Sequence, residues 1–161
     1  MMSEKKTQST EGVTASEKLK ANLQRVLIDL VDLHILGKQA HWNVTGRGFR
    51  DLHLQLDELV DAAREHSDVI AERMRALQVV PDGRSETVAA TSDLTHYPAG
   101  LVSVGETVDA VVQRVHQTVA VAREVHDDVD AEDPATADLL HAVIDDLEKQ
   151  AWMISSENRE A

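Results

Sequence analysis

The chain has 161 residues, a formal net charge of −13 and no cysteine. A chain of this length can bury a core of its own, so one domain is the default, and the lack of cysteine excludes disulfides, thiolate metal sites and cysteine nucleophiles. The acidic balance favours attraction of cations over phosphate-backbone binding by the folded surface as a whole. No secretory or membrane segment is recognisable, so we expect a soluble cytoplasmic protein.

The first predicted helix spans about residues 16–44. Its apolar or small residues recur at alternating spacings of four and three, which form one stripe only in a helix. These residues are Leu19, Leu23, Val26, Leu30, Leu33, Gly37, Ala40 and Val44. Ser16 is suited to cap the start, and Gly46 and Gly48 to stop the helix. Because Gly37 costs about 1 kcal/mol in helix propensity relative to Ala, we expect it to allow close approach of a neighbouring element.

A second predicted helix covers about residues 49–79, with Pro81 and Gly83 to close it. Its apolar residues also follow a helical period: Leu52, Leu56, Leu59, Ala63, Ile70, Met74 and Leu77. Residues 80–101 hold two of the three prolines and no long period, although residues 85–90 can form one short helix. A connection of this length can cross the length of a helix bundle.

Two more helices are predicted in the second half, separated by the acidic turn DDVDAEDPAT. The valines of the first favour strands by propensity, but their spacing is helical. The apolar positions are Val104, Val108, Val111, Val115, Ala122 and Val129 in the first helix, and Ala137, Leu140, Ile144, Leu147, Ala151 and Ile154 in the second. Pro134 fits the first turn of the last helix.

The connections between these helices predict their arrangement. Short turns make the first two and the last two helices antiparallel pairs, and the long middle connection joins the pairs across the bundle. The sequence therefore predicts an all-α, ferritin-like four-helix bundle whose long crossover contains a short helix. We expect the bundle to cover residues 16–157, between a flexible N-terminal tail (1–15) and a short C-terminal tail (158–161).

Four potential metal ligands share one face of the second helix. His53 and Asp57 are four residues apart, as are Asp68 and Glu72, so each pair can bind one cation from one side. At 100° per residue the four side chains fall within an arc of about 100°, centred about 140° from the apolar stripe of the same helix. They therefore face away from the core of their own bundle.

The two pairs cannot meet on one metal within a chain, because Asp57 and Asp68 are about 16 Å apart along the helix axis. A two-fold axis between antiparallel copies of this helix would place His53 and Asp57 opposite Asp68 and Glu72 of the partner subunit, which gives two equivalent sites per dimer. His41, at the end of the first helix, is able to reach the same site, and Trp42 is its neighbour.

Simpler interpretations remain open for these residues. A single charged pair on a helix is most often a solvated face, and Asp61 and Arg64 on this face fit interface ion pairs as well as site residues. Trp152 fits packing. We interpret the other histidines as surface residues or as residues with satisfied polar contacts: His34, His66, His96, His116, His126 and His141.

The segments KQAHWNVTGRGFRDLHLQLDE and HSDVIAERM resemble the signature of the Dps family, the mini-ferritins of bacteria. The resemblance extends over about residues 16–157 and includes HYP in the crossover and DLEKQAWMI in the last helix. It implies ferroxidase ligands from two subunits: His41, His53 and Asp57 of one, and Asp68 and Glu72 of its two-fold mate. It also implies that Trp42 intercepts radicals beside the site.

The resemblance further implies a homododecamer that oxidises ferrous iron, preferentially with hydrogen peroxide, and stores ferric mineral in its hollow interior. Carboxylate and imidazole ligands suit iron in both valences. No Glu-x-x-His motif occurs in the chain, which argues against the inward-facing site of a 24-subunit ferritin. By the same likeness, iron passes aspartate-lined three-fold pores, for which Asp138 is our first candidate and Asp133 our second.

Many members of this family bind DNA through flexible basic tails. Residues 1–20 carry four lysines and three glutamates, a net charge of only +1, yet many tails acting together can bind with useful, salt-dependent affinity. Lys5 and Lys6 are the candidate DNA contacts. The alternative to an iron-oxidising, iron-storing and DNA-protecting protein is therefore an architectural nucleoid protein with little ferroxidase activity. The intact set of five ligands favours the enzyme.

Overall fold

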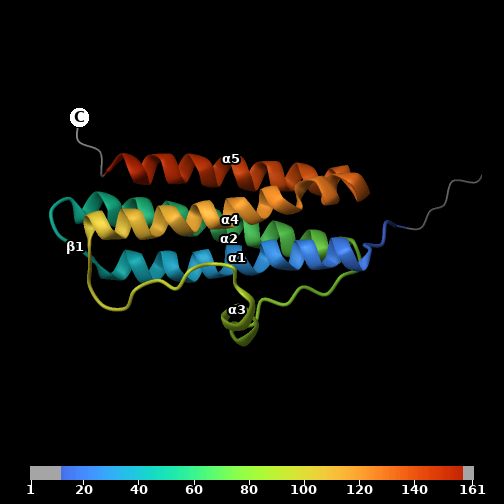
Figure 1. Ribbon diagram of the computed structural model, residues 1–161, viewed down its shortest axis with the longest axis horizontal. Coiled ribbons are helices and arrows are strands. Elements are labelled where there is room, and N and C mark those ends of the chain that lie inside the picture. The colour runs from blue at the N-terminus through green and yellow to red at the C-terminus, as the bar shows by residue number, and fades with distance from the viewer. Residues whose placement is uncertain (1–11, 158–161) are drawn as a thin grey trace, which may run out of the picture.

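The computed structural model describes residues 12–157. Four long helices form an antiparallel bundle in this part of the chain, and a short fifth helix lies on the side of the bundle (Figure 1). The helices are α1 (Glu17–Asn43), α2 (Phe49–Ala76), α3 (Ser85–Thr91), α4 (Val104–Glu132) and α5 (Pro134–Ser156). The predicted all-α fold with a short helix in its crossover is confirmed. The predicted tails fall almost entirely outside the described residues.

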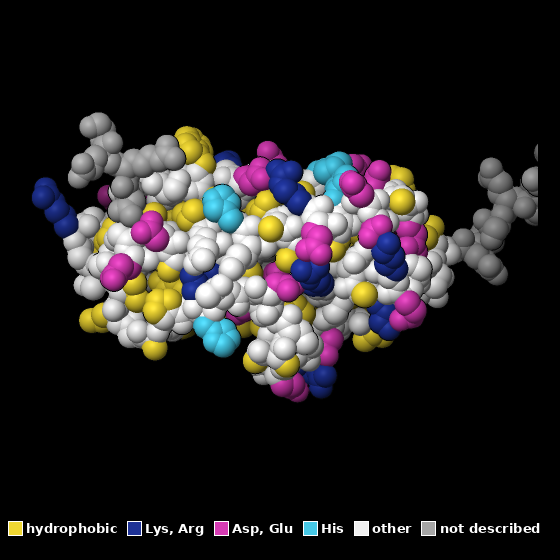
Figure 2. All heavy atoms as spheres, viewed as in Figure 1, with side chains coloured by type: hydrophobic (Ala, Val, Ile, Leu, Met, Phe, Trp, Pro, Cys, Tyr) yellow, Lys and Arg dark blue, Asp and Glu magenta, His cyan; other side chains and the backbone are white. Residues whose placement is uncertain are grey.

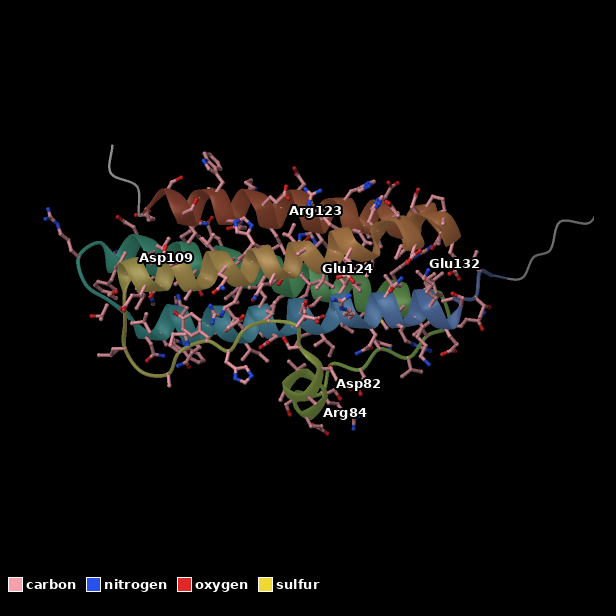
Figure 3. All side chains as sticks on the ribbon, in the orientation of Figure 1. Asp82, Arg84, Asp109, Arg123, Glu124 and Glu132 are labelled. Atoms are coloured by element: carbon pink, nitrogen blue, oxygen red, sulfur yellow. The ribbon has the colours of Figure 1, made fainter. Side chains whose placement is uncertain are left out.

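The start of α1 is fastened to the end of α4. The Ser16 hydroxyl caps α1 as predicted, because it accepts a hydrogen bond from the Leu19 amide at 3.1 Å. The amide and hydroxyl of Ser16 donate to the two carboxylate oxygens of Glu132, at 2.7 and 2.6 Å. Figure 3 shows Glu132 at this end of α4. One serine therefore caps a helix and joins two helices that are distant in sequence.

The end of α2 differs from the prediction. The helix stops at Ala76, three residues early, through a left-handed turn at Gln78 (φ 62°). The amides of Gln78 and Val79 donate to the carbonyls of Arg75 and Met74, at 3.0 and 2.9 Å, which is the Schellman arrangement. Because glutamine holds the position that glycine usually takes, the sequence carries no visible stop signal there.

Two very short strands join the helices at the opposite end of the bundle. β1 (Val44–Thr45) pairs in parallel with β2 (Val102–Ser103), so the segment after α1 is bound to the segment before α4. Val44 was predicted inside the first helix, which is wrong by one residue because α1 ends at Asn43. A strand of two residues is too short to show an alternating pattern.

The bundle core contains the apolar stripes that the helical periods predict. Gly37 lies at a close approach of α1 to α2, because a Cβ atom at this position would lie 2.9 Å from Cγ2 of Val60. This confirms the predicted role of Gly37. Trp152 was interpreted as a packing residue, and this was wrong within the single chain: 65% of its surface is exposed.

The crossover is held on α1 and α4 by buried polar groups. Asp29 is fully buried and accepts a hydrogen bond from the Asp93 amide at 2.9 Å, while its second oxygen has no partner among the described residues. Burial raises the pKa of Asp29 to about 6. On the other side, the Arg114 guanidinium donates to the carbonyls of Thr95 and His96. These contacts fix the path of the crossover along the bundle.

The surface carries both signs of charge. Figure 2 shows Asp and Glu side chains beside Lys and Arg side chains on one face of the molecule. Arg25 illustrates the pattern, since it bonds Asp93 and Glu124 at 2.7 and 3.0 Å. Among residues 12–157, no helix is both long and apolar enough to cross a membrane.

Candidate metal centre at the α1–α2 corner

His41 and His53 hold each other in place at the corner between α1 and α2. The Nδ1 atom of His41 lies 2.7 Å from the His53 carbonyl oxygen, and the Nδ1 atom of His53 lies 2.7 Å from the His41 carbonyl oxygen. The two rings stack with centroids 3.6 Å apart and planes inclined by 17°. A carbonyl oxygen only accepts, so each Nδ1 carries a hydrogen, and Nε2 is the ring nitrogen whose lone pair can bind a metal.

The local backbone explains this arrangement. His41 lies in the last turn of α1, where carbonyl groups lack a helical partner, and the His53 ring supplies one. Gly46 and Gly48 have positive φ angles of 117° and 80°, which lets the chain reverse within a few residues. Histidines that bind metals commonly fix one ring nitrogen by such a bond and present the other.

Asp57 follows His53 by one helical turn and lies beside His41. Its Oδ1 atom lies 3.4 Å from Nδ1 of His41 and 2.5 Å from Nζ of Lys38. The hydrogen bond from Lys38 holds the pKa of Asp57 below its usual value, so this carboxylate stays ionised. Lys38 was not among the predicted site residues. Its spacing of three residues from His41, which places both on one face of α1, was an available signal.

Trp42 lies next to His41 in the chain but differs from it in exposure. His41 exposes 8% of its surface and Trp42 exposes 68%. The tryptophan is therefore not part of the core of its own subunit. An exposed indole at a corner that also carries ligand-type side chains is available to a partner subunit or to solvent.

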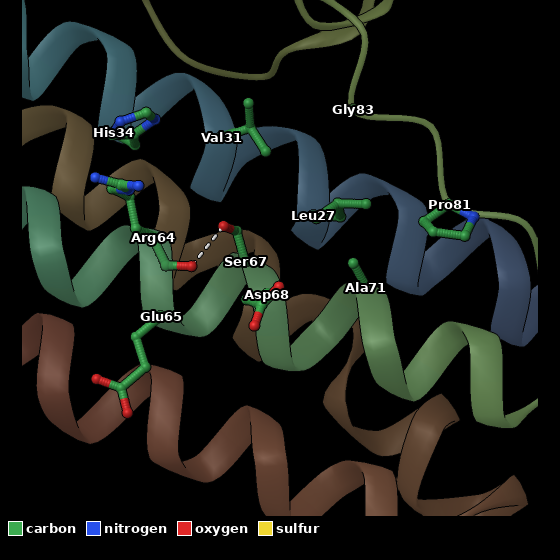
Figure 4. A pocket seen from close by; sticks show the side chains of 10 residues that line it. All are labelled: Leu27, Val31, His34, Arg64, Glu65, Ser67, Asp68, Ala71, Pro81 and Gly83. Atoms are coloured by element: carbon green, nitrogen blue, oxygen red, sulfur yellow. Dashed lines mark hydrogen bonds between the residues drawn. The ribbon is translucent and has the colours of Figure 1, made fainter.

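The other two predicted ligands do not reach this corner. Asp68 and Glu72 are exposed further along α2. Asp68 lines a pocket of about 560 Å³ between α1 and α2, together with His34 and Arg64. Figure 4 shows these side chains from close by, with the Ser67 hydroxyl donating to the Arg64 carbonyl at 2.8 Å.

The single chain therefore brings together part of the predicted set. His41, His53 and Asp57 meet at the corner, and Asp68 and Glu72 remain apart from them. In the described part of the chain, no group of three or more His, Cys, Asp or Glu residues converges to hold a metal ion. The spacing along the second predicted helix predicts that Asp68 and Glu72 act with the corner of a second chain, and this stays a prediction.

The two predicted pore residues differ in exposure: Asp133 lies between α4 and α5, and Asp138 lies in the first turns of α5. Asp133 is 8% exposed and accepts hydrogen bonds from Arg73, at 2.6 Å, and from the Thr136 hydroxyl. The hydrogen bond from Thr136 lowers the pKa of Asp133 most, and the bond from Arg73 lowers it further. Asp138 has an 82% exposed side chain, 3.4 Å from Nδ1 of His141. Because the Asp133 carboxylate is already paired within its chain, the pore prediction rests on Asp138.

Most of the remaining histidines match their interpretation as surface or satisfied residues. His66 bonds Asp146 at 2.9 Å, and His96 and His116 are exposed. His34 is half-buried in the pocket, where burial and the cations of Arg64 and Lys38 lower its pKa.

One histidine contact was not predicted. The Nε2 atoms of His126 on α4 and His141 on α5 lie 2.6 Å apart, so one ring donates and the other accepts. The two residues are 15 positions apart and on different helices. No local spacing in the sequence therefore indicated that they meet.

Comparison with known proteins gives the family. Residues 20–160 match the family described as Ferritin, the ferritin-like domain. A DNA protection during starvation protein from Agrobacterium fabrum is 34% identical over 139 residues, which cover 86% of each chain. The chain belongs to the Dps family of ferritin-like proteins. The resemblance seen in the sequence motifs is thereby confirmed.

Solved Dps structures share the fold of this Dps-family chain. DpsA14 from Streptomyces coelicolor has a TM-score of 0.85 and 31% identity, covering 89% of this chain and 86% of its own. Dps from Microbacterium arborescens in the high iron form has a TM-score of 0.85 and 29% identity, covering 92% and 100%. Dps proteins handle iron and are known as oligomeric assemblies, and this chain is a member of that family.

Proposed function

We propose that this Dps-family chain oxidises ferrous iron at sites shared between two subunits and stores the ferric product inside a homododecamer. The reciprocal contact of His41 and His53 beside Asp57 carries the proposal. It fixes two imidazoles through Nδ1, leaves their Nε2 atoms for a metal, and adds an ionised carboxylate. Imidazole with carboxylate is a donor set that suits iron.

The ligands that complete each site come from the partner subunit in this proposal. Asp68 and Glu72 are exposed on the same helix, about 16 Å or more from Asp57 along the axis. In a dimer with a two-fold axis, α2 of the partner subunit runs antiparallel to α2 of this chain. One end of the ligand-bearing face then lies opposite the other end of the same face in the partner subunit. The exposed Trp42 and Phe49 at the corner, with 68% and 48% exposure, are apolar surface of the kind that subunit contacts cover.

Hydrogen peroxide is the proposed oxidant. Two ferrous ions each give one electron to one peroxide, the oxygen–oxygen bond breaks, and two protons complete two molecules of water. Because both electrons arrive from a pair of ions, no hydroxyl radical leaves the site. Trp42 is our candidate for intercepting radicals that do form, since it lies exposed next to His41.

Oxidation of ferrous iron with each oxidant in a separate assay tests this function. Full-length protein, sized to confirm its assembly, receives ferrous iron with either hydrogen peroxide or oxygen as the oxidant. We expect a faster reaction with peroxide, two ferrous ions consumed per peroxide, and ferric iron that stays with the protein peak. Oxidation no faster than in buffer with both oxidants would contradict the proposal, and a faster reaction with oxygen would contradict the choice of oxidant.

We also propose that the protein protects DNA in the cytoplasm and contacts it through the N-terminal tail. The name of the Agrobacterium relative states such protection for that protein, and the candidate contacts Lys5 and Lys6 lie outside the described residues. Ala15 bonds the Leu77 carbonyl at 3.2 Å, so the test removes residues 1–11 only. We expect this deletion to abolish a gel shift at low salt and to leave iron oxidation unchanged. Unchanged DNA binding would exclude the tail.

A further inference from the structure

A cation of the protein already lies where the proposed site would hold iron. The Lys38 ammonium is 2.5 Å from Oδ1 of Asp57, the oxygen that also faces His41. We infer that Lys38 is an internal counter-ion of the metal site, which iron must displace from Asp57 and which limits how tightly divalent cations bind there. This inference rests on the proposed function.

The contact distance makes the ammonium and a metal ion mutually exclusive at Oδ1 of Asp57. An ammonium at 2.5 Å occupies the approach to Oδ1. A divalent cation bound to the same oxygen would lie within a few ångströms of the ammonium, where like charges repel strongly even at the dielectric of a protein surface. One of the two cations has to leave. The metal is held by further ligands, so in its presence Lys38 is the cation that moves.

Lys38 is able to move without disturbing the core. Its side chain is 33% exposed, and that of Asp57 is 42% exposed. A lysine stem is flexible and carries its charge at the end, so the ammonium can swing into water while the apolar stem stays in place. His41, in contrast, is 8% exposed and fixed by its bond to the His53 carbonyl. The site thus combines rigid imidazoles with one displaceable cation.

The need to displace Lys38 would keep more abundant hard cations such as magnesium from occupying the site. Magnesium binds through oxygen atoms and keeps most of its waters, so at this corner Asp57 is its main attraction. Ferrous iron gains imidazole ligands as well. The free energy needed to displace the ammonium from Asp57 is the same for both cations, so it leaves magnesium with little net affinity, whereas iron keeps the contribution of its imidazole ligands. We expect removal of Lys38 to make the site sensitive to magnesium.

Titration of the full-length, metal-free assembly with Co²⁺, which reports binding by its absorption, tests the inference. We expect Lys38→Met to bind Co²⁺ about fivefold more tightly at low ionic strength, with a gain that shrinks as salt is added. Lys38→Gln, which keeps a hydrogen-bond donor without the charge, serves as the second variant and should shift in the same direction. Lys38→Arg should retain the parent affinity or weaken it.

Two controls separate the counter-ion from a structural clamp between α1 and α2. The inference expects Lys38→Met to lower the stability of the metal-free protein while it raises Co²⁺ affinity, whereas loss of a clamp lowers both. It also expects no effect of Lys38→Met in an Asp57→Asn background. Lys149→Met removes an exposed lysine that lies 3.9 Å from Asp146 on α5, and it should leave Co²⁺ affinity unchanged.

Different results would contradict the counter-ion role of Lys38 and the metal site itself. If both Lys38→Met and Lys38→Gln bind Co²⁺ no more tightly than the parent, while His53→Ala loses binding, the counter-ion role is overturned and the metal site stands. If the parent binds no Co²⁺, or if His53→Ala binds it as well as the parent, the metal site itself is wrong and the inference falls with it.

Discussion

Histidines and carboxylates lie close together at two places in the bundle, and their hydrogen-bond partners differ between the two. At the α1–α2 corner, backbone carbonyls fix the imidazoles of His41 and His53 through Nδ1, so the other ring nitrogens are kept for a ligand. At the α4–α5 corner, the polar atoms bond one another: Asp133 bonds Arg73, and His126 bonds His141. A pair of histidines thus becomes a candidate metal site where the backbone satisfies one nitrogen of each ring and leaves the other nitrogen for a ligand.

Removal of a ligand at the α1–α2 corner should give the largest effect. We expect His53→Ala to slow ferrous oxidation about 100-fold or more, because the variant loses a ligand and also the ring that bonds the His41 carbonyl. Stopped-flow absorbance of ferric iron measures the rate. His116→Ala, which truncates an exposed histidine on α4, is the control. If both variants oxidise iron at the parent rate, the corner is not the site.

Removal of a carboxylate at the α4–α5 corner should affect stability instead. We expect Asp133→Ala to lower the free energy of unfolding by about 2 kcal/mol at neutral pH, because it leaves Arg73 without its buried partner. Its oxidation rate per folded subunit should equal that of the parent. Asp130→Ala, at an exposed position in the last turn of α4, is the control.

The sign of the pH dependence follows from the lowered pKa of Asp133. An unfolded aspartate titrates near pH 3.9, at about its ordinary value. The contribution of Asp133 is therefore complete above this pH and is lost as the pH falls through the lower pKa of the folded state. Denaturation of parent and variant at pH 7 and near pH 3 should show the gap narrowing in acid. A gap that widens in acid would contradict the assignment.

A smaller effect is expected from the exposed aspartate of the same corner. Asp138→Asn should slow iron uptake about twofold at low ferrous concentration and low salt, because it removes a charge that attracts cations to the proposed pore. The difference should vanish at high salt. Uptake into the assembled particle measures the effect, with His53→Ala as a variant impaired at every iron concentration. Parental uptake by Asp138→Asn under all conditions would place the pore elsewhere.

Much of the fold was predictable because it depends on periods that one helix displays by itself. The stripes of the four long helices, the Ser16 cap and the close approach at Gly37 are all confirmed. The end of α2 was not predictable, because Gln78 adopts a left-handed conformation that glutamine rarely takes. The pairing of β1 with β2 likewise depends on contact between distant segments.

The candidate site was predictable only as a set of side chains. The spacing of His53 and Asp57 places both on one face of α2, and that much follows from the helix. The reciprocal bonds with His41 depend on how tightly the corner turns, and the pairing of Asp133 with Arg73 joins residues 60 positions apart. No local pattern encodes either contact. Lys38 was missed because a single lysine on a polar face is ordinary.

Exchange of subunits tests most directly whether the site is shared. A chain with His53→Ala and Asp57→Ala is mixed with a chain carrying Asp68→Ala and Glu72→Ala, and the particles are reassembled. In a hybrid dimer one site then has all five proposed ligands and the other keeps only His41. We predict that each variant alone is inactive and that the mixture regains part of the ferrous oxidation rate. No recovery in particles shown by mass spectrometry to contain both chains would contradict a site shared between subunits.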